Sequence, residues 1–275
     1  MPEIESARGL LVTESYKQTE GLPIIRRRSA AFAYILRNIP IVIRDNELIV
    51  GSATKAPRGC QVFPEYSYEW LEAEFDTVAT RAADPFYISE QTKAELHQAY
   101  SYWKGKTNSD LAKANMAPEA YAAFTKHNVF TPGNYFYNGI GHVCVQYDKV
   151  LAKGYRGIIA EATAALEKLD VSDGDYVQRS NFLYAVIESC EAVIEYAHRY
   201  AKLAAELAIQ ETDATRKAEL KAIAKNCTHV PEFPATSFYE ACQSFWFVQL
   251  LLQVESSGHS ISPGRFDQYM YPYYK

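Results

Sequence analysis

The sequence has no excess of positive charge and no long hydrophobic run. Lysine and arginine number 28 against 33 aspartates and glutamates, which gives a formal net charge of -5. Because proteins that bind nucleic acid or anionic membranes display clustered basic residues, this balance argues against both partners. The most apolar stretch, residues 245–254, is interrupted by Gln249 and Gln253. A membrane-spanning helix needs about 20 apolar residues, so we expect no membrane segment.

Disulfide, metal and common catalytic motifs are also missing. The five cysteines are odd in number, lie far apart and form no C-x-x-C pair: Cys60, Cys144, Cys190, Cys227 and Cys242. The first five residues include two glutamates and form no apolar stretch, unlike a secretory signal, so we expect a soluble cytoplasmic protein with reduced thiols. The sequence contains no H-E-x-x-H, P-loop or G-x-S-x-G motif. His142 and His259 lack an evident third ligand, so we expect no metal site.

Hydrophobic periodicity indicates a mainly α-helical chain with few strands. Hydrophobic residues make up 48% of the sequence and charged residues 22%, as in ordinary globular proteins. Helical spacing is clearest in residues 147–169, 175–210 and 214–225. Residues 41–51, two β-branched runs around an Asp-Asn turn, predict a β-hairpin. The tail around Pro272 predicts no closing helix.

Another helix is expected over residues 237–255. Ser237 followed by Glu240 is a capping-box pattern and marks its start. The segment is apolar on most of its circumference, which predicts that it lies in the interior.

The first candidate site is the loop that contains His142. Gly139 and Gly141 precede this histidine and permit a tight turn with close approach to a small ligand. An imidazole there would hydrogen-bond a substrate hydroxyl or act as a general acid. The alternative is a histidine that only satisfies a buried loop backbone. Cys144, between two valines, is expected in a buried strand and therefore to be inert.

The second candidate site is the polar segment 255–267. It follows the buried helix, so we expect its serines and His259 to point into an interior, where a hydroxyl-rich substrate would supply hydrogen-bond partners. The alternative is a turn whose hydroxyls cap helix ends, with Arg265 and Asp267 as a local ion pair.

Four sequence blocks carry a family resemblance: residues 38–52, 61–65, 133–142 and 258–274. Together they resemble the pyruvate formate-lyase-like glycyl radical enzymes, most of all the cobalamin-independent glycerol and propane-1,2-diol dehydratases. The resemblance implies that residues 1–275 are the amino-terminal part of an incomplete pyruvate formate-lyase domain. That domain is a ten-stranded α/β barrel wrapped in helices.

The resemblance also implies a chemistry and a set of partners. A radical-SAM activating enzyme installs a radical on a glycine, which generates a thiyl radical in a Gly-Cys-x-Glu loop. His142 resembles the histidine near the departing hydroxyl and is the candidate proton donor. His259 and Ser260 resemble the pair that hydrogen-bonds the diol. The expected partners are a small polyol, the activating enzyme, the remainder of the barrel and, in a complete enzyme, a second copy in a homodimer.

The radical apparatus has no counterpart in this sequence. None of the five cysteines is followed by x-Glu, and no radical-glycine segment is present. We therefore expect a chain with no cofactor of its own that is inactive alone and exposes apolar surface around residues 245–252. Two alternatives remain: a family member for choline, isethionate or hydroxyproline, and a non-catalytic helical helper module.

Overall fold

The computed structural model describes residues 1–131, 133 and 136–275. Helices dominate, as predicted, and the strands are short. The helices are α1 (Ala7–Gln18), α2 (Ile24–Asn38), α3 (Glu69–Glu72), α4 (Glu90–Trp103), α5 (Asn108–Ala114), α6 (Pro118–Thr125), α7 (Tyr147–Leu166), α8 (Tyr176–Gln210), α9 (Ala214–His229), α10 (Phe238–Ser256) and α11 (Phe266–Tyr274). The strands are β1 (Glu3–Glu5), β2 (Gly59–Gln61), β3 (Val143–Cys144) and β4 (Ile261–Ser262), and a 3-10 turn covers Val78–Thr80.

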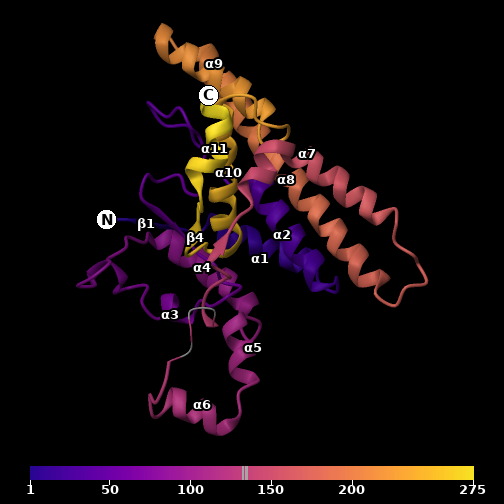
Figure 1. Ribbon diagram of the computed structural model, residues 1–275. Helices are drawn as coiled ribbons and strands as arrows, with labels where there is room; N and C mark the ends of the chain where they lie inside the picture. The colour runs from indigo at the N-terminus through magenta and orange to yellow at the C-terminus, as the bar shows by residue number, and fades with distance from the viewer. Residues whose placement is uncertain (132, 134–135) are drawn as a thin grey trace.

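The longest helix, α8, organises the bundle. It has 35 residues, which corresponds to roughly 52 Å at the usual helical rise. Helices α2, α7 and α9 pack along it, whereas α6, without a buried residue among those described, projects away with α5 (Figure 1). Tyr196 and Tyr200 of α8 are buried against Phe247 of α10, so these two helices share one core.

Helix α10 lies in the interior, as its apolar circumference predicted. Phe247 and Gln243 are completely buried, and the Ser237 hydroxyl caps the first turn by accepting from the Glu240 backbone N–H at 3.3 Å. The Glu240 carboxylate does not bond back to Ser237, as a full capping box requires. It accepts instead from the backbone N–H of Thr236 at 2.7 Å. The helix start is therefore confirmed, but the Glu240 carboxylate binds the Thr236 N–H in place of the Ser237 N–H.

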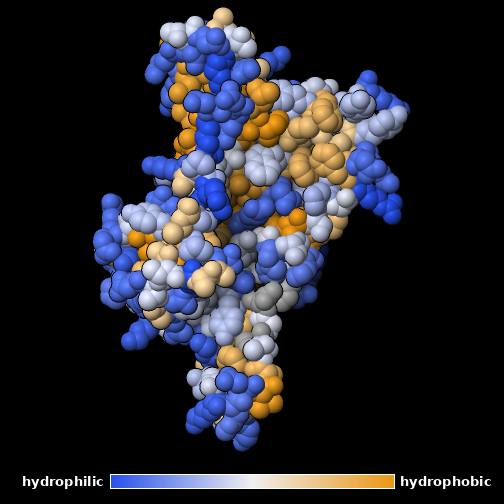
Figure 2. All heavy atoms as spheres, turned by 90° about the vertical axis from the view of Figure 1, so that its left-hand side faces the viewer, coloured by the Kyte–Doolittle hydropathy of each residue, from blue (hydrophilic) through white to orange (hydrophobic). Residues whose placement is uncertain are grey.

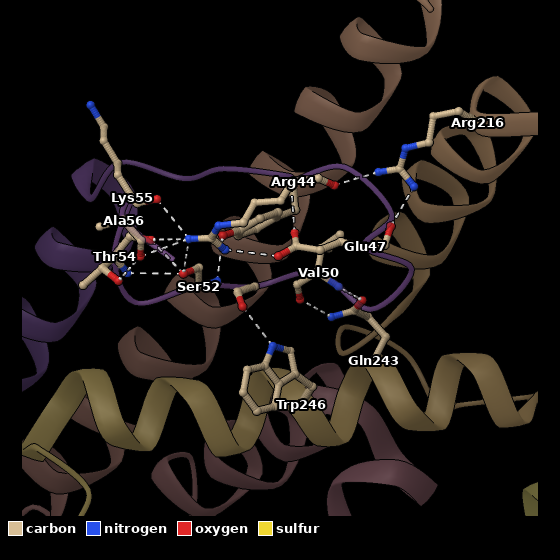
Figure 3. Close-up of polar contacts among 12 residues, drawn as sticks. Arg44, Glu47, Val50, Ser52, Thr54, Lys55, Ala56, Arg216, Gln243 and Trp246 are labelled. Atoms are coloured by element: carbon tan, nitrogen blue, oxygen red, sulfur yellow. Dashed lines mark hydrogen bonds and ion pairs between the residues drawn. The ribbon is translucent and has the colours of Figure 1, made fainter. Parts of the chain in front are cut away.

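The predicted hairpin at residues 41–51 is wrong, because these residues form no strand pair. Side chains from neighbouring helices take the place of a partner strand. The Gln243 amide donates to the Val50 carbonyl at 2.7 Å and accepts from the Val50 N–H at 2.9 Å, while the Trp246 indole donates to Gly51 at 3.0 Å (Figure 3). Arg216 of α9 donates to the Glu47 carbonyl at 2.8 Å. The β-branched pattern reflects packing beneath helices.

The far end of the same segment folds around Arg44. Its guanidinium pairs with Glu47 and donates to the Ser52 hydroxyl at 3.2 Å and the Thr54 and Lys55 carbonyls at 3.1 and 3.0 Å (Figure 3). A single planar side chain with several fixed donors therefore closes the loop, which needs no backbone ladder.

Two separate pairs of parallel strands complete the fold. Strand β1 pairs with β2, and β3 pairs with β4 in the register Val143–Ile261 and Cys144–Ser262. Among the described residues neither sheet has more than two strands, in keeping with the sequence. The second pair brings together segments far apart in the chain.

The expectation of an end without a closing helix is also wrong. Helix α11 runs through Pro272, and Met270 is buried in a small apolar cluster with Leu151 and Ala241. Packing against α7 and α10 therefore holds this helix despite its internal proline.

Apolar surface around α10 is only partly covered. Within residues 245–252 every side chain is buried or half-buried, but a groove of about 450 Å³ runs beside Val248, Leu251 and Leu252. Phe182, across the groove on α8, is 55% exposed. Figure 2 shows apolar side chains beside a hollow on the face that it presents. No helix in the described part of the chain is long and apolar enough to cross a membrane.

Candidate functional site

The β3–β4 pair places the two Gly-His loops side by side. The backbone N–H of His142 donates to the His259 carbonyl at 3.1 Å, just before the strands pair. The imidazole centroids lie 5.2 Å apart, with the rings inclined at 79°. The two histidines singled out in the sequence are therefore direct neighbours.

Glycines allow the loops to approach this closely. A Cβ on Gly141 would lie 2.0 Å from the His259 carbonyl oxygen, and one on Gly139 would lie 2.4 Å from that of Ser256. The Ser256 hydroxyl also donates to the Ile140 carbonyl at 3.0 Å. The glycines were expected to admit a ligand, but in the structure they admit the neighbouring loop.

The site backbone includes three non-glycine residues in the left-handed region. They are His142 with φ of 56°, Ser257 with φ of 62° and Ser260 with φ of 56°. Such residues are uncommon, cost energy and cluster at functional sites. Ser260 directly follows His259, and the His142 N–H donates to the His259 carbonyl, so the unusual backbone coincides with the candidate substrate contacts.

The second loop is less buried than predicted. His259 is half-buried, whereas Ser260, Arg265 and Asp267 are exposed. No ion pair joins Arg265 to Asp267, two residues within the described part of the chain. Within segment 255–267, Ser256 and Ile261 are buried, whereas residues 262–267 are exposed. The side of the loop that carries Ser260 is therefore open to a ligand or to further polypeptide.

Gln249 supports the second loop from α10 and was missed as a site residue. Its amide donates to the Ile261 carbonyl at 3.1 Å, and its oxygen accepts from the buried Tyr147 hydroxyl. Burial raises the pKa of Tyr147, so this hydroxyl stays protonated as a donor. The signal was in the sequence: Gln249 interrupts an otherwise apolar helix, where a buried amide needs partners.

No metal centre emerges from the described residues, which contain no group of three potential ligands among histidine, cysteine, aspartate and glutamate. The reactive groups of the candidate site are the imidazoles of His142 and His259 and the hydroxyl of Ser260. These groups donate and accept hydrogen bonds and transfer protons. They suit a small ligand that carries hydroxyl groups.

Cys144 lies in β3, as predicted, but it is exposed rather than buried. By contrast, burial raises the pKa of Cys190 and of Cys227 to about 12 each, so at pH 8 both thiols stay in the unreactive protonated form. Burial also raises the pKa of Cys60 and Cys242.

We therefore expect one fast thiol when the folded 275-residue chain reacts with Ellman's reagent at pH 8. Cys144→Ser should remove the fast phase, and Cys190→Ser should leave it intact. A fast phase that persists in Cys144→Ser would show that another thiol is accessible.

Comparison with known proteins identifies the family of this chain. Residues 1–275 match the family described as pyruvate formate lyase-like. A structure from Roseburia inulinivorans concerned with 1,2-propanediol dehydration is 63% identical, with a TM-score of 0.97 over 100% of this chain and 33% of that one. The glycerol-bound B12-independent glycerol dehydratase from Clostridium butyricum is 56% identical, with a TM-score of 0.96 over 99% of this chain and 34% of that one.

A curated relative, the (2S)-3-sulfopropanediol dehydratase of Klebsiella oxytoca, is 36% identical over 99% of this chain and 33% of its own length. The chain thus spans about a third of the length of these relatives. The match along its whole length confirms the resemblance seen in the four sequence blocks. The chain belongs to the pyruvate formate lyase-like family of glycyl radical enzymes.

Proposed function

We propose that this chain forms one side of the substrate pocket of a glycyl radical lyase that removes water from glycerol or propane-1,2-diol. The observation that carries the proposal is the pairing of the His142 loop with the His259–Ser260 loop through β3 and β4. The identities of 63% and 56% to proteins described for these two diols support it. We further propose a cytoplasmic enzyme that is a homodimer when complete.

Each site residue has a distinct role in this proposal. His142 donates a proton to the departing hydroxyl, which makes loss of water from a ketyl-like radical far easier than loss of hydroxide. His259 and Ser260 hydrogen-bond the diol and hold its hydroxyls in a fixed orientation. Donors that are already oriented need no rearrangement during the reaction.

In a complete enzyme, a glycyl radical installed by a radical-SAM activating enzyme would generate the cysteine thiyl radical that takes hydrogen from the substrate. The residues present here do not fit that role. Cys60 follows a glycine but is followed by Gln61 and Val62, and the other four cysteines also lack the x-Glu pattern. This chain therefore binds and orients substrate and leaves radical transfer to other polypeptide.

The test compares two polypeptides after anaerobic treatment with the activating enzyme. The product of the complete reading frame that contains residues 1–275 should convert glycerol or propane-1,2-diol to an aldehyde. The 275-residue chain alone should give no aldehyde, because it has no thiyl cysteine. Both are assayed with the two diols, isethionate, choline and trans-4-hydroxyproline.

Each outcome of this assay is informative. If kcat/KM is higher for isethionate, choline or hydroxyproline than for either diol, that compound is the substrate and the proposed diol is wrong. If the 275-residue chain alone forms aldehyde, radical transfer does not depend on other polypeptide, and that part of the proposal is wrong. A reading frame without a Gly-Cys-x-Glu segment would favour the helper module.

A further inference from the structure

Arg8 is a buried arginine on α1. It lies far along the chain from the two proposed substrate loops, which are the first loop around His142 and the second loop around His259 and Ser260. Its side chain is 2% exposed, and a guanidinium in that position needs partners for its charge and its donors. It pairs with Glu65 through two bonds, from Nη1 at 3.1 Å and from Nη2 at 2.6 Å. The guanidinium carbon also lies 3.8 Å from the centre of the Phe63 ring. The pair is therefore fixed in both position and plane.

The remaining donors of Arg8 reach the last turn of α10. Nε donates to the Val254 carbonyl at 2.6 Å, and Nη2 donates to the Glu255 carbonyl at 3.0 Å. Nη1 donates to the Val62 carbonyl at 3.2 Å, so all five N–H donors have an acceptor. The final carbonyls of a helix lack partners within the helix and form its negative end, where a cation is favourable.

The helix end that Arg8 holds leads directly into the second substrate loop. Helix α10 ends at Ser256, the chain turns through Ser257 and Gly258 with positive φ, and His259 and Ser260 follow. The turn is short, so the direction of the last helical turn sets where His259 lies.

A second arm of the same cluster reaches the first substrate loop. Arg28 of α2 pairs with the Glu255 carboxylate and donates to the Tyr66 hydroxyl at 3.0 Å. That hydroxyl lies 2.8 Å from where a Cβ on Gly139 would stand. Because Tyr66 directly follows Glu65, the partner of Arg8, one charged cluster borders both loops.

We propose that Arg8 is a positioning residue for the substrate, which sets His259 and Ser260 against His142 through the end of α10. This inference rests on the proposed diol pocket and adds a residue that touches no substrate. A lysine at this position would keep the charge but offers three donors from one nitrogen. It cannot hold the Glu65 carboxylate bidentately and both α10 carbonyls at once.

The first test measures loop position without activity. With histidine-selective labelling of the 275-residue chain, the nuclear Overhauser effect between the His142 and His259 rings, 5.2 Å apart, reports their contact. Arg8→Lys should lose this signal while cooperative thermal unfolding is retained. Arg37→Lys is the matched control, because Arg37 forms a surface pair with Glu195 in which both side chains are more than 40% exposed. It should keep the signal.

The second test measures catalysis in the complete reading frame. Arg8→Lys should lower kcat/KM for the diol about 10- to 100-fold, with glycyl radical content by electron paramagnetic resonance equal to that of wild type. Arg37→Lys should leave both unchanged. A role limited to stability would lower radical content and activity together.

The two tests separate the possible failures. If Arg8→Lys keeps both the ring contact and kcat/KM, the proposal is overturned. If the ring contact is lost but the wild type converts no diol, the positioning role stands and the proposed substrate fails. If Arg8→Lys does not fold, Glu65→Gln takes its place in both tests. Glutamine keeps the shape of the glutamate side chain but removes the charge that pairs with Arg8. If both Arg8→Lys and Glu65→Gln lose the contact between the His142 and His259 rings only when the protein unfolds, the cluster has a purely structural role. That result would overturn the proposal.

Discussion

Replacing Gly141 by alanine is expected to lower kcat/KM for diol dehydration about a hundredfold in the complete enzyme. The added Cβ would stand 2.0 Å from the His259 carbonyl oxygen and 2.7 Å from Cδ2 of its ring. No real Cβ tolerates such contacts, so the two loops must separate by about 1 Å. That movement breaks the backbone bond from His142 to His259 and displaces both imidazoles from a substrate held between them.

Gly174→Ala is the matched control for this prediction. Gly174 is exposed, its φ is not in the left-handed region, and a Cβ there meets nothing within 4 Å. Both variants are activated in parallel, and their rates are divided by the glycyl radical content. If Gly141→Ala retains kcat/KM within about threefold of Gly174→Ala, the close approach of the loops is unimportant for the reaction.

The helices were predictable because their periodicity is a local property. Residues 175–210 carry apolar side chains at helical spacing, and α8 occupies Tyr176–Gln210. Helix α10 was predictable for the same reason, and its all-round apolar character also gave its interior position. Local pattern and tertiary packing agree in these elements.

The segment 41–51 shows where local pattern fails. Alternating β-branched residues indicate a buried extended chain, and Val50 is fully buried. They do not reveal which groups form hydrogen bonds with the backbone of this segment. Here the partners are side chains of Gln243, Trp246 and Arg216, which lie far along the sequence. A hairpin and a loop held by helices therefore have the same local signature.

The candidate site was predictable in part. His142 and His259 stood out beside glycines, but only the family resemblance placed them in one pocket, because no local property links the two loops. The residues that hold the loops could not be identified in this way. Gln249 and Arg8 act through partners 12 and 246 positions away, which a single sequence does not disclose.

The largest stability effect is expected at Gln243, which replaces a β-strand partner for Val50. Its amide both donates to and accepts from the Val50 backbone, at 2.7 and 2.9 Å, in a fully buried position (Figure 3). Gln243→Met keeps the length of the side chain and removes both bonds. The N–H and C=O of Val50 would then be buried without partners, at a cost of about 1–3 kcal/mol each. We expect the free energy of unfolding to fall by about 2–5 kcal/mol.

Urea unfolding of the 275-residue chain measures this loss, with Gln98→Met as the matched control. Gln98 is exposed on α4, so its replacement should change stability by less than about 0.5 kcal/mol. A typical domain is stable by only about 5–15 kcal/mol, so the Gln243→Met variant should unfold at a clearly lower urea concentration. Equal midpoints for the two variants would mean that water or a backbone shift satisfies Val50 after the amide is removed. In that case the Val50 backbone would not depend on the Gln243 amide for its hydrogen bonds.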